Sequence, residues 1–386
     1  MRDADVVIVG AGPGGCSTVL HLLDRDPRLA DHLLLLDRAR FPRPKLCGGG
    51  ITWFGYQILE QLGLVDLDGF GAREIRVRYR GRQASFHGDP TVRLVEREAF
   101  DARLLAEVRR RGARVREGVA VRAVQVHRDR VELFTGAGTL TAAAVVAADG
   151  SGSAVRRSLP WARRTPMART LEVLTPVDPS ADTEHVDRAM TLDFSGISSH
   201  GLQGYSWAFP TFLAGRPHVS LGVYDSRIHS RRPKALMAPL LHDLVAARGL
   251  EPHTLRPRSF PIRLWDGRCP ASGPRAILVG DAAGADPLLG EGIPFALAHG
   301  EIAAESIVQG LCSSDLGFAG HSGRLVEHPV LRQLPTRHAV ARILYRLRNP
   351  ILLSLTWVAV RRLVSNLDRA GRVWRGLERL TRAGQR

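Results

Sequence analysis

Three glycines near the N-terminus have the spacing of a dinucleotide phosphate loop. Gly10, Gly12 and Gly15 follow the apolar run 6–9, and a helical pattern begins directly after them. In such a turn the first glycine allows a tight bend, the second lets backbone approach a pyrophosphate, and the third lets helix pack on strand. A second apolar run ends in Asp37, whose carboxylate can accept hydrogen bonds from ribose hydroxyls. The pattern predicts a dinucleotide site; a ligand-free glycine turn in an α/β core is the alternative.

A second group of residues that could do chemistry surrounds Cys47. Residues 41–52 contain two prolines and three consecutive glycines, which predicts a loop of unusual backbone conformation. One interpretation is a backbone lying flat against a ligand, with the Cys47 thiol and the amides of Gly48 and Gly49 exposed to it. The other is a domain-connecting loop with a buried cysteine. The residues alone leave both open.

Aromatic residues alternate in the segment 204–210. Tyr205, Trp207 and Phe209 fall on one face of a strand, because successive side chains point to opposite faces. Such a face is either part of a core or the wall of a ligand cavity.

Two acidic turns follow buried strand patterns further along the chain. Asp149-Gly150 follows the run 142–148, and Gly280-Asp281 follows 275–279. Residues beyond the carboxyl ends of parallel strands are where α/β sheets bind ligands. The turn 290–293 then opens a helix at 294–309, whose first amides could stabilise negative charge.

The elements that must position these residues predict an α/β fold, α+β overall. A discontinuous Rossmann-like domain takes residues 1–72, 96–160 and 269–325. An interleaved antiparallel-sheet domain, which would bind substrate, takes residues 73–95 and 161–268. A basic helical segment takes residues 326–386, with helices expected at 336–349 and 351–382.

Charge is concentrated at the C-terminus. The chain carries a net charge of +16, and residues 324–386 contain fourteen arginines, no lysine and three acidic residues. An apolar stripe with two tryptophans, flanked by arginine, suits a helix on anionic lipid; a helix packed on the protein body is the alternative. No zinc-finger or RNA-binding signature accompanies the charge, so we expect no nucleic acid partner. Cysteine and histidine spacing predicts no metal. The N-terminus runs directly into a strand, which predicts no secretory signal.

Together the motifs resemble the flavoprotein oxidoreductases of the para-hydroxybenzoate hydroxylase type. These proteins carry G-x-G-x-x-G, an Asp-Gly motif and a Gly-Asp motif in one FAD-binding fold, and this chain has all three in order. Within that group the sequence is most similar to the geranylgeranyl reductase family. The likeness rests on the segments 44–49, 205–210 and 287–293. Thr211 stands where many reductases have lysine. Flavin-dependent halogenases are also similar, but their W-x-W-x-I-P motif is absent.

The resemblance implies roles for particular residues. Ala11, Gly12 and Gly15 would hold the FAD pyrophosphate, Asp37 the adenosine ribose, and Arg97 the phosphates or ribityl chain. Arg38 is also counted as cofactor-binding. The Val121 backbone would meet the adenine. Asp281, following Gly280, would bind the ribityl chain, and Gly292 and Ile293 would lie near the flavin ring. Asp149 would lie between FAD and the path of NAD(P)H. The loop of Cys47, Gly48 and Gly49 would lie beside the flavin, facing the substrate.

The implied activity is FAD-dependent reduction of a carbon–carbon double bond in an isoprenoid or related lipid. Cys47 could supply the proton or simply shape the pocket, and Tyr205, Trp207 and Phe209 would contact the apolar substrate, with Tyr205 and Trp207 also counted as catalytic. NADPH, or ferredoxin, would be the reductant. The alternatives are an FAD-dependent monooxygenase or other tailoring oxidoreductase, then a halogenase. The expected location is the cytoplasm, with the inner face of the membrane reached peripherally through the C-terminal helices.

Overall fold

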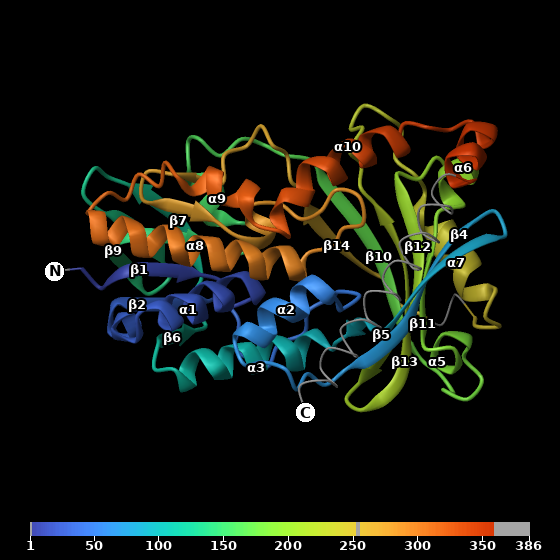
Figure 1. Cartoon of the computed structure of the whole chain (residues 1–386), viewed down its shortest axis with the longest axis horizontal. Helices are drawn as coiled ribbons and strands as arrows, with labels where there is room; N and C mark the ends of the chain where they lie inside the picture. The colour runs from blue at the N-terminus through green and yellow to red at the C-terminus, as the bar shows by residue number, and fades with distance from the viewer. Residues whose placement is uncertain (1, 252–254, 359–386) are drawn as a thin grey trace, which may run out of the picture. The chain divides into compact units, whose positions relative to one another are not determined.

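The computed structural model describes residues 2–251 and 255–358, which form two compact units (Figure 1). Unit 1 comprises Met1–Asp68, Glu96–Arg169 and Phe260–Ala341. Unit 2 comprises Gly69–Val95, Thr170–Ser259 and Arg342–Arg386. Each unit is therefore assembled from three separate stretches of chain.

Parallel strands form the centre of unit 1. In the part of the chain that the structure describes they run in the order β16-β9-β1-β2-β6. The residues of β1 and β2 are almost all buried, and their near-continuous apolar sequences are typical of strands covered on both faces. The bounds are β1 (Ala4–Val9), β2 (Leu33–Asp37), β6 (Arg114–Glu117), β9 (Gly138–Ala147) and β16 (Ala276–Leu278), with the short β15 (Ser272–Gly273) antiparallel to β16.

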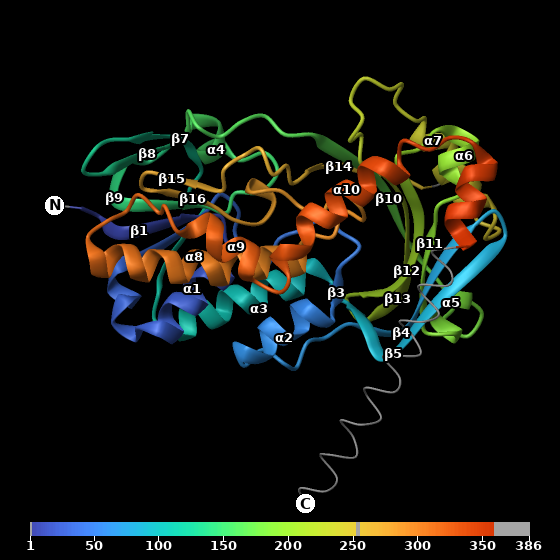
Figure 2. The same ribbon diagram turned by 45° about the horizontal axis from the view of Figure 1, so that its top comes forward.

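Helices cover one side of this sheet. There α1 (Pro13–Arg25) packs against α8 (Ile293–Ser313) and α3 (Arg97–Arg110) (Figure 2). The first two approach closely at Gly300, where a Cβ would lie 2.6 Å from Cβ of Ser17. The remaining elements of unit 1 are β3 (Gly50–Thr52), α2 (Trp53–Gln61), α4 (Ala154–Ser158), α9 (His321–Glu327), the start of α10 (Leu334–Leu344), and the 3-10 helices η1 (Pro27–His32), η3 (Gly280–Ala282) and η4 (Leu331–Gln333).

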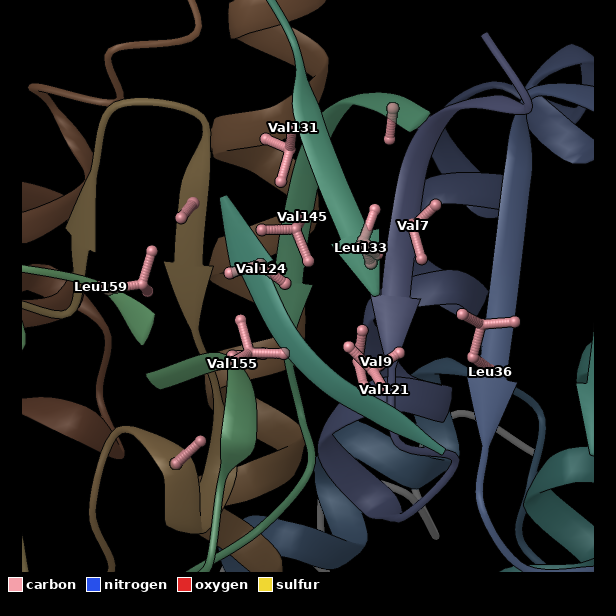
Figure 3. Packing of buried hydrophobic residues seen from close by; sticks show 14 of the residues in the cluster. Val7, Val9, Leu36, Val121, Val124, Val131, Leu133, Val145, Val155 and Leu159 are labelled. Atoms are coloured by element: carbon pink, nitrogen blue, oxygen red, sulfur yellow. The ribbon is translucent and has the colours of Figure 1, made fainter. Parts of the chain in front are cut away.

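A hairpin covers the other side of the sheet. It consists of β7 (Val121–Val126) and β8 (Val131–Thr135), which pair antiparallel. Strand β8 also pairs antiparallel with β9. Figure 3 shows Val121 beside Val9 and Val124 beside Val145, within one buried cluster. This packing holds the ends of β1, β2 and β9 in fixed positions.

Unit 2 is built on a second sheet, with the strand order β10-β13-β12-β11-β4-β5. Helix α7 packs on one face, against a cluster that includes Val173, Ala208 and Leu221. The bounds are β4 (Phe70–Tyr79), β5 (Arg82–Leu94), β10 (Met167–Pro176), β11 (Ala189–Asp193), β12 (Gly204–Leu213), β13 (Arg216–Asp225), β14 (Arg258–Arg263), α5 (Thr183–Val186), α6 (Gly196–His200) and α7 (Met237–Ala246).

The described part of the expected C-terminal segment 326–386, residues 326–358, is divided between the two units. Residues up to Ala341 group with unit 1, where Arg337 pairs with Asp286, and residues 342–358 group with unit 2. In unit 2 the ring of Trp357 lies 6.0 Å from that of Tyr79. The other expected boundaries differ from the observed ones by fewer than ten residues.

The helix expected at 336–349 ends earlier, at Leu344. Proline disfavours helical backbone in the residue before it, and Asn349 precedes Pro350. The Asn349 side chain instead caps the next helix by accepting the N–H of Ile351 over 2.8 Å. That helix is described only to residue 358, so the prediction for the rest of 351–382 lies outside the described residues.

Candidate functional site

The glycine turn between β1 and α1 requires two of its glycines for its own geometry. Gly10 has a φ of +107°, and a Cβ there would lie 2.3 Å from the carbonyl oxygen of Ala148. A Cβ at Gly15 would lie 1.8 Å from the carbonyl oxygen of Gly10. Neither position can accept a side chain without moving backbone.

Gly12 is different, because the chain itself leaves space beside it. Its φ is −78°, and the nearest atom to an added Cβ would be Nη2 of Arg43, at 3.9 Å. Gly12 is also the N-cap of α1, where first-turn amides and the helix dipole favour an anion. The fold gives no internal reason for glycine here, whereas a closely approaching pyrophosphate would.

Asp37 ends β2 directly beside the glycine turn. Its carboxylate accepts the N–H of Ala11 and the N–H of Ala39, each over 2.8 Å. The carboxylate is therefore oriented before any ribose arrives. Ala11, one of the residues that the resemblance assigns to the pyrophosphate, thus donates its amide to Asp37. Arg38 is exposed next to it.

Two arginines share one buried carboxylate close to Gly12. Arg97, the first residue of α3, makes a two-pronged ion pair with Asp101 at 2.9 and 2.8 Å, and Arg43 reaches the same carboxylate at 3.0 Å. Burial opposes the charge on Arg97, but Asp101 and Cys47 outweigh it and raise the pKa of Arg97. The cluster carries one net positive charge. Arg43 and Asp101 were not predicted; the one sequence signal was an acid on the apolar face of α3.

The Cys47 thiol is exposed, which excludes the buried-cysteine interpretation of its loop. Its sulfur accepts the N–H of Gly49 over 3.4 Å and contacts the Arg97 guanidinium. Gly49 has a φ of +72°, and Gly48 is half-buried between the two. Nearby, the Lys45 ammonium lies 3.3 Å from the centre of the Phe260 ring. Burial lowers the pKa of Lys45 to about 8, although Asp281 acts in the opposite direction.

The segment before β7 is bonded to the end of β2. Gly118 and Val119 donate their N–H groups to the carbonyls of Ala39 and Asp37. Val121, the first residue of β7, lies two residues further along with a buried side chain. The Val119–Asp37 bond brings the start of β7 near Asp37 in space, and the adenine contact of the Val121 backbone stays a prediction.

Asp149 serves the local fold. One of its oxygens accepts the N–H groups of Ala154 and Val155 at the start of α4. The other, Oδ1, is buried and has no hydrogen-bond partner among the described residues, and burial raises the pKa of the carboxyl. Arg156 donates to the carbonyl of Ala282, which ties α4 to η3.

Asp281, which the resemblance assigns to the ribityl chain, lies in η3 just after β16. Its Oδ2 accepts the hydroxyl of Ser151 over 2.9 Å, and Oδ1 would lie 3.4 Å from a Cβ on Gly292. Gly280, just before it, has a φ of +55°. Gly292 is the N-cap of α8 and Ile293 its first residue, so Asp281 faces a helix N-terminus.

An ionic network missed by sequence reasoning holds this last turn. Arg337 reaches Asp286 at 2.9 Å and Glu291 at 2.8 Å, and Glu291 also accepts the hydroxyl of Thr52. Burial raises the pKa of Glu291, which Arg337 counteracts. The partners are far apart in sequence, so no local pattern identifies them.

The aromatic residues lie in unit 2, on one face of β12. The ring centres of Tyr205 and Trp207 are 6.3 Å apart, and Trp207 stacks on Phe209 at 5.9 Å. All three side chains are buried. The predicted alternation is therefore present.

The residues of unit 1 fit FAD. Gly12 leaves room for a pyrophosphate, and Arg43 and Arg97 supply positive charge beside it. Asp37 and Asp281 present oriented carboxylates. The N-termini of α1 and α8 lie at the strand ends, where such folds bind phosphates and other anions. No group of three metal-ligating side chains occurs among the residues that the structure describes. Fold and site thus define an FAD-dependent oxidoreductase.

Comparison with known proteins narrows this class. Residues 3–293 match the family model of the FAD binding domain. The chain is 30% identical to menaquinone reductase of Mycobacterium tuberculosis, over 98% of this chain and 97% of that protein. It is also 30% identical to digeranylgeranylglycerophospholipid reductase 2 of Methanopyrus kandleri, over 81% and 79%. The chain belongs to the geranylgeranyl reductase family of FAD-dependent oxidoreductases.

Solved structures share the fold. A geranylgeranyl bacteriochlorophyll reductase-like protein of Thermoplasma acidophilum superposes with a TM-score of 0.76 at 21% identity, over 92% of this chain and 91% of that one. The halogenase PltM gives 0.69 at 17% identity, over 96% and 84%. At these identities the likeness concerns architecture only.

Proposed function

We propose that this protein reduces a carbon–carbon double bond in the isoprenoid chain of an apolar lipid or related substrate. The observation that carries the proposal is the exposed Cys47 thiol, held by Gly49 and Arg97 inside the residue set that fits FAD. The named relatives support the substrate class, because menaquinone and digeranylgeranyl lipids both contain prenyl chains. Tyr205, Trp207 and Phe209 are assigned to contact that chain.

Reducing an alkene requires a hydride at one carbon and a proton at the other. FAD, once reduced, supplies the hydride chemistry. We assign the proton to Cys47, because the Gly49 amide and the Arg97 guanidinium can stabilise the negative charge left on its sulfur. The α8 N-terminus at Gly292 favours negative charge next to Asp281. The chain thereby orients the cofactor and holds one proton at a defined atom.

Replacing Cys47 by serine should slow alkene reduction about a hundredfold, within the usual range for losing a general acid. FAD affinity and chemical reduction of the bound flavin should be unchanged, because a hydroxyl preserves the shape of the loop. The measurement is a single-turnover reaction under anaerobic conditions with a prenylated quinone. Product is followed by mass spectrometry as a gain of two hydrogen atoms.

Cys312→Ser is the matched control, because this second exposed thiol lies at the end of α8. Alkene reduction by Cys47→Ser at the wild-type rate would remove the assigned role. Oxygen incorporated into product in air, with no anaerobic reduction, would favour the monooxygenase alternative. We propose NADPH as the electron donor, with ferredoxin as the alternative; the rate of flavin reduction by each decides between them.

We also propose that the C-terminal region binds the surface of an anionic membrane. In the helix after Asn349, Leu353 and Trp357 are buried, whereas Ile351, Leu352 and Leu355 are between 50 and 70% exposed. Eight arginines follow in residues 361–386. An exposed apolar face followed by basic residues suits the interface of an anionic bilayer. Among the described residues, no helix has the length and apolarity to cross a membrane.

Substituting Ile351 and Leu355 with aspartate should weaken binding to phosphatidylglycerol vesicles about tenfold or more. Apolar groups that would insert into the bilayer are then replaced by negative charge, which anionic lipid repels. Co-sedimentation of the full chain measures this, at low and high salt. Val186→Asp, at a position in unit 2 that is 57% exposed, is the control. Equal sedimentation of all three proteins would contradict membrane binding.

A further inference from the structure

Three polar side chains form a hydrogen-bonded chain on the aromatic face of the unit 2 sheet. The indole Nε1 of Trp207 donates to Ser220 Oγ over 2.9 Å, and Ser220 Oγ donates to Glu172 Oε1 over 2.7 Å. They belong to the adjacent strands β12, β13 and β10. All three residues are buried.

The indole ring of Trp207 packs against the backbone at Gly222. Gly222 pairs with Trp207 across β12 and β13, and a Cβ there would lie 2.2 Å from Cζ2 of Trp207. The ring therefore covers the backbone of β13, and only glycine leaves it room. The hydrogen bond to Ser220 then determines the direction in which the N–H of the Trp207 indole points.

The Glu172 carboxyl has no cationic partner within the described part of the chain. Its side chain receives a hydrogen bond from Ser220, and burial raises its pKa to about 7 while Ser220 acts in the opposite direction. A buried carboxyl without a counter-charge costs free energy, and an apolar residue of the same size would avoid that cost. Packing of the sheet alone therefore gives no reason for this residue.

The other ionisable groups described near these strands do not contribute to the pKa shift of Glu172. Tyr205, Tyr224 and His218 share its face, and Arg258 on β14, the other neighbour of β10, is exposed. On the opposite face α7 carries His242 and Asp243. Burial and Ser220 alone account for the displaced pKa of Glu172.

We propose that Glu172 and Ser220 are positioning residues for Trp207, and that the neutral carboxyl keeps the aromatic face in the form that binds an apolar substrate. The identity of the substrate rests on the proposed function. When Glu172 ionises, the carboxylate draws water toward Ser220 and the indole. Contact with a prenyl chain is then weakened.

The test compares two replacements of Glu172 in the full, FAD-loaded chain. In the wild type, KM for a prenylated quinone should rise about tenfold between about pH 6 and about pH 8.5, as Glu172 loses its proton. Glu172→Gln keeps the acceptor for Ser220 but cannot ionise, so its KM should stay low and flat with pH. Glu172→Met removes the acceptor and should raise KM about fivefold at every pH, with the rate of flavin reduction unchanged.

Glu184→Gln is the matched control. Glu184 is also a buried carboxyl of unit 2 that accepts a hydroxyl, from Thr191, but it pairs with Arg248. Thr191 lies opposite Ala208 in the pairing of β11 with β12, on the face away from Trp207. Replacing Glu184 should therefore leave the pH profile of KM as in the wild type.

A second readout needs no substrate. The difference in tryptophan fluorescence between wild type and Trp207→Phe should titrate near pH 7, and Glu172→Gln should abolish that titration. If it persists in Glu172→Gln, the positioning role is overturned, whatever the substrate. If it disappears while no prenylated substrate is reduced, the positioning role stands and the proposed function fails.

Discussion

Replacing Gly12 by alanine is expected to leave the chain folded and to lower its affinity for FAD at least a hundredfold, or about 2.7 kcal/mol. The backbone at Gly12 suits any residue, and an added methyl group would meet only Arg43, at 3.9 Å. The same methyl group would occupy the space in which a pyrophosphate approaches α1. Titration of the apoprotein with FAD, followed by flavin fluorescence, measures the loss.

Two further glycines make this result specific. Gly15→Ala should prevent correct folding, because its Cβ would lie 1.8 Å from the Gly10 carbonyl oxygen. Gly323→Ala in α9 meets no atom within 4 Å and should behave as wild type. Circular dichroism separates loss of fold from loss of ligand. Wild-type FAD affinity in Gly12→Ala would place the pyrophosphate elsewhere.

Acidification from about pH 7 to about pH 5 should destabilise unit 1 by about 4 kcal/mol through two buried histidines, at 1.36 kcal/mol per pH unit for each. Burial lowers the pKa of His299 in α8 to about 3 and that of His321 in α9 to about 4. The folded state keeps both rings neutral, while the unfolded chain takes up protons below about pH 6.5. Their stability contribution is therefore complete above that pH and is lost as the pH falls.

Urea unfolding at the two pH values, followed by flavin release, measures this effect. His299→Phe removes one titrating ring and should reduce the loss by about 2 kcal/mol. Comparing variant with wild type cancels other groups, including Glu172, whose raised pKa acts in the opposite direction. The exposed His200, replaced by asparagine, is the control. Identical pH dependence in His299→Phe and wild type would contradict the prediction.

The sequence predicted those parts of the fold and site that depend on neighbours along the chain. The glycine turn, Asp37 at the end of β2 and the alternation of Tyr205, Trp207 and Phe209 are local patterns, and each lies in the expected element. The end of α10 was placed too late: the helix ends at Leu344, and Asn349, included in the predicted helix, caps the next one. The Rossmann-like class followed from the buried strands together with the glycine turn and Asp37.

Contacts between distant segments could not be predicted in this way. Arg43 meets Asp101 across 58 residues, and Arg337 meets Asp286 across 51. The Ala11 amide turns to Asp37 because the registers of β1 and β2 bring them together. The link from Trp207 through Ser220 to Glu172 depends on strand order and register, which no pattern within one strand encodes.

The three-part construction of unit 1 has a consequence during synthesis. Strand β1 and helix α1 are translated first, but their partners come much later in the chain. Strand β1 pairs with β9, which also pairs with β16, and α1 packs against α8, which ends at Ser313. At roughly 5–20 residues per second, a ribosome needs about 15–60 s to translate the intervening chain. A nascent polypeptide stalled before β16 should therefore hold no flavin. Cofactor loading is a late event, and the unfinished sheet edge is a natural binding surface for chaperones until then.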